Sequence, residues 1–392
     1  MATARKAEGR HDPTAADAPA PAAADPAVDV ELARLRGEID RVDRELLARL
    51  NERATLGVAV GELKARTGRP VFSAARERDL LAALAQANRG PFPTPAIEPV
   101  FREIISATRA LERPMRIAYL GPEGTFAHEA ARRAFGAAVE LVPVSPIAEI
   151  FAAVERGEVE HGVAPVENTT QGVVTETFDT LATSEVALCG ETLLRVSYQL
   201  LSRSGRLEEI KSVASHPQGL AQCRLWLDRH LPGVERVETP STAAAAKLAA
   251  ADATVAAVAR AVGGETCWLA VAARAVGGRR DNTTRFLLLG RQAPARSGND
   301  LTSAVFTVRK AQAGALHRLL EPFARHGVNL TSIQSRPMPG KSFEYLFFLD
   351  LEGHRDDPAV VAPLADAAAA AHSQRVLGSF PRAALAEEGS AP

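Results

Sequence analysis

Six consecutive residues, Asp281 to Phe286, combine side chains suited to an anionic substrate that must lose an oxygen leaving group. Asn282, Thr283 and Thr284 offer neutral hydrogen-bond donors. The neighbouring Arg285 offers a planar guanidinium group that is always positively charged. Taken alone, the stretch also fits a turn followed by a buried strand, because the apolar run 286–289 comes next. Other polar loops in the middle of the chain favour the first interpretation, the mouth of an active site.

Four such loops each lie between a predicted strand and a predicted helix. The strands are 116–120, 163–166, 212–214 and 234–237, and the loops that follow them are 121–126, 167–172, 215–218 and 239–242. Open α/β sheets bind ligands at the carboxyl ends of their strands. Helix N-termini add exposed N–H groups and positive dipole ends, which favour carboxylates. Each loop singly also fits a helix cap and turn, but together they predict one site.

The region before these loops predicts an all-helical domain. Large apolar residues recur every three or four positions between 29 and 66, at Leu32, Leu35, Ile39, Val42, Leu46, Leu50 and Leu56. One helix of that length would span roughly 55 Å, and a lone helix cannot bury such a stripe. We therefore expect partner helices from a second subunit. Two shorter helices, at 73–87 and from the N-cap Thr94 with Pro95 in its first turn, should complete the domain near Leu111.

Basic residues on the long helix have an informative spacing. Arg53 and Lys64 are close to three full turns apart, so both could grip one anion. Arg36 lies roughly 25 Å before Arg53 along the axis and cannot reach the same small ligand within one chain, whereas a partner chain could supply it. A solvated basic face is the alternative interpretation.

The residues after 300 follow the order β-α-β-β-α-β, which predicts a ferredoxin-like sandwich behind the Gly-, Pro-, Ser- and Arg-rich linker 290–300. The first 28 residues hold almost nothing large enough to bury, and we expect a disordered leader there.

Composition excludes several classes of protein. A net charge of -1 and a pI near 6.8 lack the electrostatic footprint of a nucleic-acid binder. The three cysteines, Cys189, Cys223 and Cys267, have no partners at ligand spacing, so neither disulfides nor a metal site are indicated. No apolar run has membrane-spanning length, and no signal peptide pattern opens the chain, so we expect a cytoplasmic protein.

The first domain resembles the helical chorismate mutases, which are intertwined dimers. The matching runs are 35–36, 52–53, 61–64 and 76–78. By this resemblance Arg36 of the other subunit, Arg53 and Lys64 clamp the carboxylates of chorismate. Arg76 belongs to the same binding set, Glu77 takes the hydroxyl, and Thr108 and Glu112 lie on one face of the third helix. Glu112 has to be protonated to donate to the ether oxygen. Ser73 stands where some members carry an acidic residue, so that role stays unassigned.

The middle of the chain resembles prephenate dehydratase in the motifs 121–126, 165–172, 215–218 and 284–286. The resemblance implies two α/β lobes of periplasmic-binding-protein type with the substrate between them, and no cofactor. Thr284 then aids departure of the hydroxyl, Arg285 and Thr125 hold carboxylates, and Asn168 and Gln222 line the cleft. The other binding positions of these motifs are Phe126, Glu167, Thr169, Ser215, His216 and Phe286. We interpret Thr284 as a hydrogen-bond donor, because its hydroxyl is too weak an acid to release a full proton. His216 could be an acid or simply cap the next helix.

The C-terminal region resembles the ACT domain that binds phenylalanine. The matching positions are Gly314, Ala315 and Leu316 in one motif and Gln334, Ser335, Arg336 and Pro337 in the other. Gln334 stands where the related motif has Glu, which removes a charge that could recognise the ammonium group of the ligand.

The three resemblances together are those of a bifunctional chorismate mutase/prephenate dehydratase with a regulatory ACT domain. The expected boundaries are 29–113, 114–292 and 300–385, with chorismate and prephenate as substrates, phenylalanine as feedback inhibitor and a homodimer or larger assembly. Arogenate as a further substrate, channelling between the two sites and the strength of inhibition stay open. Two rivals are a solute-binding protein and a phenylalanine-sensing regulator without catalysis. The absence of an export signal disfavours the first, and the presence of residues for both chemistries disfavours the second.

Overall fold

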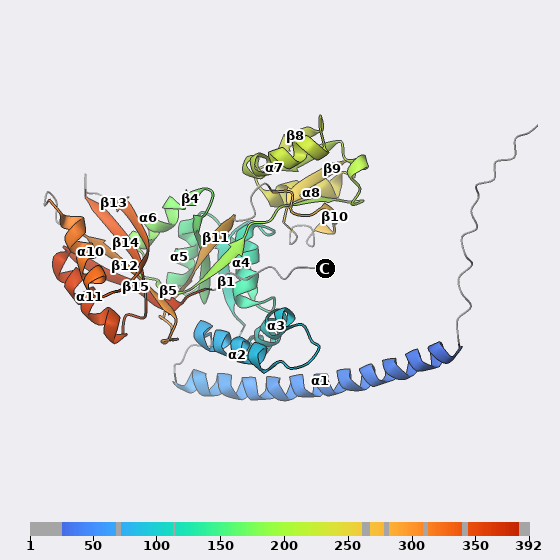
Figure 1. The fold of residues 1–392 in the computed structure, drawn as a ribbon, viewed down its shortest axis with the longest axis horizontal. Coiled ribbons are helices and arrows are strands. Elements are labelled where there is room, and N and C mark those ends of the chain that lie inside the picture. The colour runs from blue at the N-terminus through green and yellow to red at the C-terminus, as the bar shows by residue number, and fades with distance from the viewer. Residues whose placement is uncertain are drawn as a thin grey trace, which may run out of the picture. The chain divides into compact units, whose positions relative to one another are not determined.

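A computed structural model describes residues 26–67, 72–112, 114–260, 267–277, 282–308, 313–338 and 344–383. The predicted leader up to residue 25 and Asp281 of the polar stretch lie outside the described residues. The chain divides into two compact units, residues 1–55 and 56–392. Figure 1 shows the elements in chain order.

Three helices form the helical domain: α1 (Pro26–Thr67), α2 (Ala74–Ala87) and α3 (Thr94–Glu112). The prediction of one long helix followed by two shorter ones is confirmed. Ser73 begins α2 as its N-cap, and its hydroxyl accepts a hydrogen bond from the backbone N–H of Arg76 (3.3 Å). Helices α1 and α3 approach closely, since a Cβ added at Gly61 would lie 2.8 Å from Cβ of Glu112. The absence of a side chain at Gly61 allows this packing.

The first lobe of the middle domain is a mixed sheet with the strand order β2-β1-β3-β11-β5, and β4 pairs with β3. Its strands are β1 (Arg116–Leu120), β2 (Glu140–Val144), β3 (His161–Asn168), β4 (Gly172–Val173), β5 (Ala187–Arg195) and β11 (Thr283–Gly290). Its helices are α4 (Phe126–Phe135), α5 (Ile147–Glu155) and α6 (Thr175–Thr183). Strand β11 is antiparallel to both β3 and β5 and lies between them.

The second lobe is inserted between β5 and β11. Its sheet has the order β10-β6-β9-β7-β8. Its elements are β6 (Gln199–Ser202), the 3-10 turn Leu207–Glu209, β7 (Ser212–Ser215), α7 (Pro217–His230), β8 (Glu235–Glu238), α8 (Thr242–Ala251), β9 (Val255–Ala259) and β10 (Ala270–Ala273). The predicted two-lobed α/β fold is confirmed.

The C-terminal domain has an antiparallel sheet of order β13-β14-β12-β15. Its elements are β12 (Asp300–Thr307), α10 (Ala315–Arg325), β13 (Leu330–Pro337), β14 (Tyr345–Glu352), α11 (Pro358–Ala370) and β15 (Ser373–Pro381), the predicted β-α-β-β-α-β order. Side chains alternate along β14. Phe347 and Leu349 pack on the side of α10 and α11, whereas Leu346 and Phe348 share a core with the first lobe.

The C-terminal sheet and the first lobe are packed together. Strand β15 lies against β5, and a Cβ added at Gly378 would overlap the carbonyl oxygen of Leu188. Phe178 of α6 meets Phe348 of β14 edge to face, with ring centroids 5.0 Å apart. One hydrophobic core therefore continues from the first lobe into the C-terminal domain.

Candidate functional site

Four amide and hydroxyl side chains link the two lobes, and we call this set the amide chain. The Asn168 side-chain nitrogen donates to Oγ1 of Thr284 (2.8 Å) and to Oδ1 of Asn282 (2.8 Å). Nδ2 of Asn282 in turn donates to Oε1 of Gln222 on α7 of the second lobe (2.9 Å). The structure therefore brings together Thr284, Asn168 and Gln222, three residues that the sequence placed in one site.

Both oxygen and nitrogen atoms of Asn168 are fully used, which fixes its orientation. Its Oδ1 accepts from the backbone N–H groups of Thr170 (2.9 Å) and Gln171 (3.0 Å). The amide nitrogen must therefore point at Thr284, whose hydroxyl acts as acceptor in that contact. The Thr284 hydroxyl keeps its own hydrogen for another acceptor, because the oxygen receives one bond and can still donate one. Thr284 is buried, so that donation takes place in a site with little water.

Asn282 is the residue that sequence reasoning named as a donor but gave no role in the site. It is buried and joins the two lobes through Asn168 and Gln222. The signal that could have found it is the two-residue period of a strand, since Asn282 and Thr284 lie on one face at the start of β11.

The same alternation places Arg285 on the opposite face of β11 from Thr284, so the structure does not bring Arg285 beside the amide chain, where the sequence had placed it as a carboxylate-binding group. Its Nε donates to Oε2 of Glu191 (2.7 Å), and one terminal nitrogen donates to Oδ2 of Asp350 (2.6 Å). Burial lowers the pKa of Arg285, but Asp350 and Glu191 outweigh it and raise the pKa above its ordinary value. Two nitrogens of the guanidinium are thus held by carboxylates of this chain, and its second terminal nitrogen is buried without a hydrogen-bond partner among the described residues.

Phe286 also lies away from the amide chain. Its ring is 1% exposed and packs in the core of the first lobe with Tyr119 and Phe135. Phe286 therefore packs β11 against the core of the first lobe, and the structure does not bring it beside the amide chain.

The loop after β1 shows how local structure presents Thr125. Thr125 is the N-cap of α4, and its hydroxyl accepts from the N–H of His128 (3.3 Å). Gly124 takes a positive φ of 82° and donates its N–H to Nδ1 of His128 (3.1 Å). Burial lowers the pKa of His128, which keeps Nδ1 an acceptor. Phe126 opens α4 and meets the ring of Tyr198 edge to face at 5.7 Å.

The remaining loop positions have identifiable structural partners. His216 is the N-cap of α7, and its Nδ1 accepts from the N–H of Gln218 (3.3 Å), which agrees with the capping alternative. Ser215 is buried and donates to the carbonyl of Val258 (2.7 Å). Thr169 accepts the N–H of Thr283 (3.0 Å), and Glu167 pairs with Arg285 in the β3–β11 ladder. These residues shape the loops around the amide chain.

In the helical domain, α1 is continuous through Arg36 and Arg53, so these two residues are roughly 25 Å apart along the helix axis. Thr108 lies on α3 opposite Gly57, and Glu112 lies opposite Gly61. Oε2 of Glu112 is buried, and no described residue donates to it.

The other helical-domain candidates lie on two helices. Lys64 is half-buried near the end of α1, and Arg76 is exposed in the first turn of α2. Glu77 forms a short ion pair with the buried Arg109. The sequence did not predict that partner for Glu77.

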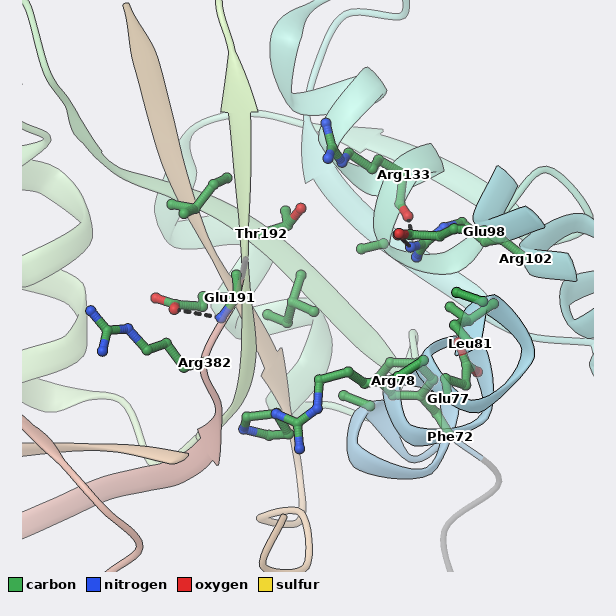
Figure 2. A pocket seen from close by; sticks show the side chains of 18 of the residues that line it. Phe72, Glu77, Arg78, Leu81, Glu98, Arg102, Arg133, Glu191, Thr192 and Arg382 are labelled. Carbon is green, nitrogen blue, oxygen red and sulfur yellow. Dashed lines mark hydrogen bonds and ion pairs between the residues drawn. The ribbon is translucent and has the colours of Figure 1, made fainter. Parts of the chain in front are cut away.

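Residues of α2, α3, the first lobe and the end of β15 line a cavity of about 370 Å³. Its lining side chains, among them Phe72, Glu77 and Glu191, are drawn in Figure 2. Glu77 and Glu191 both line it, whereas Thr284, Asn168 and Gln222 do not. Several of its arginines have protein partners. Arg78 donates to the carbonyl of Ser297 (3.2 Å), Arg102 pairs with Glu98, and Arg382 pairs with Glu352. The cavity is therefore separate from the amide chain and lies where three domains meet.

The predicted effector residues occupy two places in the C-terminal domain. Gly314, with a positive φ of 73°, is the N-cap of α10, and Ala315 and Leu316 form its first turn. Gln334, Ser335, Arg336 and Pro337 end β13. Arg336 forms two hydrogen bonds with Asp179 of α6, each 2.9 Å long. Gln334 is half-buried on the same face of β13 as Arg336.

Within the described residues, no cluster of three or more His, Cys, Asp or Glu side chains could hold a metal ion. None of the described helices is long and apolar enough to cross a membrane.

Comparison with known proteins matches each domain to a family. Family models match residues 35–113 (chorismate mutase type II), 117–294 (prephenate dehydratase) and 303–369 (ACT domain). The bifunctional chorismate mutase/prephenate dehydratase of Aquifex aeolicus is 42% identical over 361 residues, which cover 91% of this chain and 99% of that relative. The solved prephenate dehydratase of Arthrobacter aurescens in complex with L-Phe is 35% identical, with a TM-score of 0.62, and covers 69% of this chain and 93% of its own. GqqA, described as a novel type of quorum quenching acylase, is 29% identical with a TM-score of 0.63, covering 68% of this chain and 98% of its own.

Proposed function

Because this chain belongs to the bifunctional chorismate mutase/prephenate dehydratases, we propose that its amide chain around Thr284 and its helical domain carry the two successive reactions. The enzyme rearranges chorismate to prephenate and then converts prephenate to phenylpyruvate. The observation that carries the residue-level proposal is the hydrogen-bonded set Thr284, Asn168, Asn282 and Gln222.

In the dehydratase reaction, prephenate loses carbon dioxide and hydroxide and gains an aromatic ring. The barrier is the departure of hydroxide, a poor leaving group. Thr284 donates its hydrogen to the oxygen that leaves, while the amide of Asn168 holds the Thr284 oxygen in place. A donor aimed at developing charge in a buried site typically contributes a factor of about 100 to 1,000 in rate.

The carboxylates of prephenate need a positive environment other than Arg285. The N-termini of α4, capped by Thr125, and of α7, capped by His216, follow loops of the two lobes. Their N–H groups and dipole ends favour anions without a further cation. Gln222, on α7, ties that helix to the amide chain.

For the mutase reaction we propose a homodimer through the helical domain. Apolar side chains repeat along α1 and are exposed to solvent, among them Ile39 at 59% and Leu46 at 57%. A second copy of α1 would bury this stripe and would bring the partner subunit's Arg36 to Arg53 and Lys64. The rearrangement needs no nucleophile, only cations that hold a compact conformer and a donor at the ether oxygen. Glu112 is the proposed donor, and Thr108 lies one turn before it.

For regulation we propose that phenylalanine binds the C-terminal domain at the residues around Gly314 and 334–337. The support is the ACT family match and the relation to a dehydratase solved with L-Phe. For the compartment we propose the cytoplasm, where free thiols such as Cys189 and Cys223 stay reduced.

One assay tests both reactions: the purified chain is given chorismate, and prephenate and phenylpyruvate are followed with and without phenylalanine. We expect phenylpyruvate to form and phenylalanine to slow the second step. Prephenate that accumulates without phenylpyruvate would overturn the dehydratase proposal. A parallel assay with arogenate decides whether the amino acid analogue is also a substrate.

A further inference from the structure

Arg285 is held by carboxylates from two different domains. Glu191 lies on β5, the strand next to β11, and its second oxygen accepts the N–H of Ala383 (2.9 Å). Asp350 lies on β14 of the C-terminal domain, and its second oxygen accepts the hydroxyl of Ser303 on β12 (2.5 Å). The residue adjacent to Thr284 is thus bonded both to its own lobe and to the regulatory sheet.

Arg285 is paired with two carboxylates, although one would be enough to neutralise its single positive charge. One guanidinium, with 17% of its side chain exposed, faces two carboxylates with 4% and 11% exposed. Burying a carboxylate costs free energy unless it is paired and hydrogen-bonded, and Glu191 alone would neutralise Arg285. Asp350 is therefore more than a counter-ion, and its hydrogen bond from Ser303 holds it in the orientation that meets Arg285.

The backbone of β11 is irregular at this position. Its ladder with β3 shifts register between Arg285 and Phe286. Residues 278–281, which precede the strand, lie outside the described residues. A side-chain anchor at Arg285 therefore adds a restraint where one of the two ladders is interrupted, one residue away from the Thr284 hydroxyl.

We propose that Asp350 is a positioning residue for the dehydratase reaction. Through Arg285, it fixes the N-terminal end of β11 so that the Thr284 hydroxyl meets Asn168 and the substrate. The regulatory sheet thereby helps to set the rate of the catalytic strand. This inference rests on the proposed role of Thr284. Small displacements of a catalytic group have large effects, because a shift of about 1 Å can lower a rate by roughly a hundredfold.

The test is Asp350→Asn in the full chain, which removes the charge and keeps the size. We expect kcat for prephenate to fall roughly tenfold or more, because the variant acts on the orientation of Thr284. The KM for prephenate should stay within about twofold, because no binding group is changed. Chorismate turnover by the same protein should equal that of wild type, which controls for folding and concentration.

The matched control is Asp179→Asn. Asp179 also joins the C-terminal domain to the first lobe, but it does so through Arg336 of β13 and not through Arg285. Loss of an interdomain ion pair alone should therefore leave kcat for prephenate near wild type. A fall equal to that of Asp350→Asn would show that domain packing in general is responsible and would overturn the proposal.

Further outcomes also decide. A kcat within twofold of wild type, a change confined to KM, or an equal loss of mutase activity would each overturn the positioning role. If Asp350→Asn does not fold, Ser303→Ala tests the same link, with a two- to threefold fall in kcat expected and no change rejecting it. A wild-type protein that forms prephenate but no phenylpyruvate would instead refute the proposed function of Thr284.

Discussion

The two catalytic regions of this chain differ in how much of each the single chain assembles. Around Thr284, one chain joins side chains from both lobes by hydrogen bonds, although they are 60 to 116 residues apart in sequence. On α1, the residues expected to bind chorismate are spread along a single helix whose apolar stripe is exposed. Two folded lobes of one chain can bring such side chains together, whereas a single helix cannot bury its own apolar stripe, so we expect a second chain to complete the other site.

This difference predicts that the two activities respond separately to substitution. Changes in the first lobe should act within one chain, and changes on α1 should act across subunits. The bifunctional chain carries its own control in each case, because the untouched activity reports on folding.

The largest effect is expected from Thr284→Ala. Removing the only hydroxyl donor of the amide chain should lower prephenate turnover by about a hundredfold or more and leave chorismate turnover near normal. Thr284→Ser, which keeps the hydroxyl, should retain most of the rate. Steady-state assays of both reactions decide, and an equal loss of both activities in Thr284→Ala would indicate misfolding.

The second effect concerns the subunits. Arg36→Ala and Arg53→Ala should each abolish most mutase activity. After subunit exchange, an equal mixture should recover about a quarter of the wild-type rate, because half of the dimers are hybrids and each hybrid has one intact site. No recovery after confirmed exchange would refute the shared site. Dehydratase rates should stay constant throughout.

A smaller effect should follow from Gly61→Ala. The added methyl group would lie 2.8 Å from Cβ and Cγ of Glu112 and must push α1 and α3 apart. Overpacking of this kind costs about 1 to 3 kcal/mol, which exceeds the gain of up to about 1 kcal/mol in helix propensity. Mutase activity should fall several-fold. The matched control is Gly37→Ala on the same helix, where a Cβ meets nothing within 4 Å and thermal unfolding should show equal or higher stability.

The smallest effect is expected from Gln334→Glu. A carboxylate at this position would add an ion pair to the ammonium group of phenylalanine, so binding should tighten by a few-fold. Isothermal titration with phenylalanine measures it. Unchanged or weaker affinity would show that Gln334 does not face the ammonium group.

Local sequence patterns predicted the helices and strands and their order along the chain. Hydrophobic periodicity and the residue types of loops depend on residues that are close in sequence, so they can be recognised without the structure. The resemblance to prephenate dehydratase named Thr284, Asn168 and Gln222, and the structure places them in one hydrogen-bonded set. The sequence patterns did not predict the partner of Arg285, because Asp350 is 65 residues away and belongs to another domain. The strand period could have separated Arg285 from Thr284, but the stretch was interpreted as a loop, in which side chains do not alternate. Glu77 shows the same limit, since its partner Arg109 comes from another helix.

The late position of β11 has a consequence for the making of the enzyme. The ribosome synthesises β3 and β5 long before β11, because the whole second lobe lies between β5 and β11 in the sequence. Until β11 inserts, β3 and β5 each expose an unpaired edge, which is the kind of surface that promotes aggregation. Pairing across so many residues is also slow, because the loop must close before any contact forms. Because the hydroxyl of Thr284 lies on this last strand of the first sheet, we expect a nascent chain to gain dehydratase activity only when that sheet is complete.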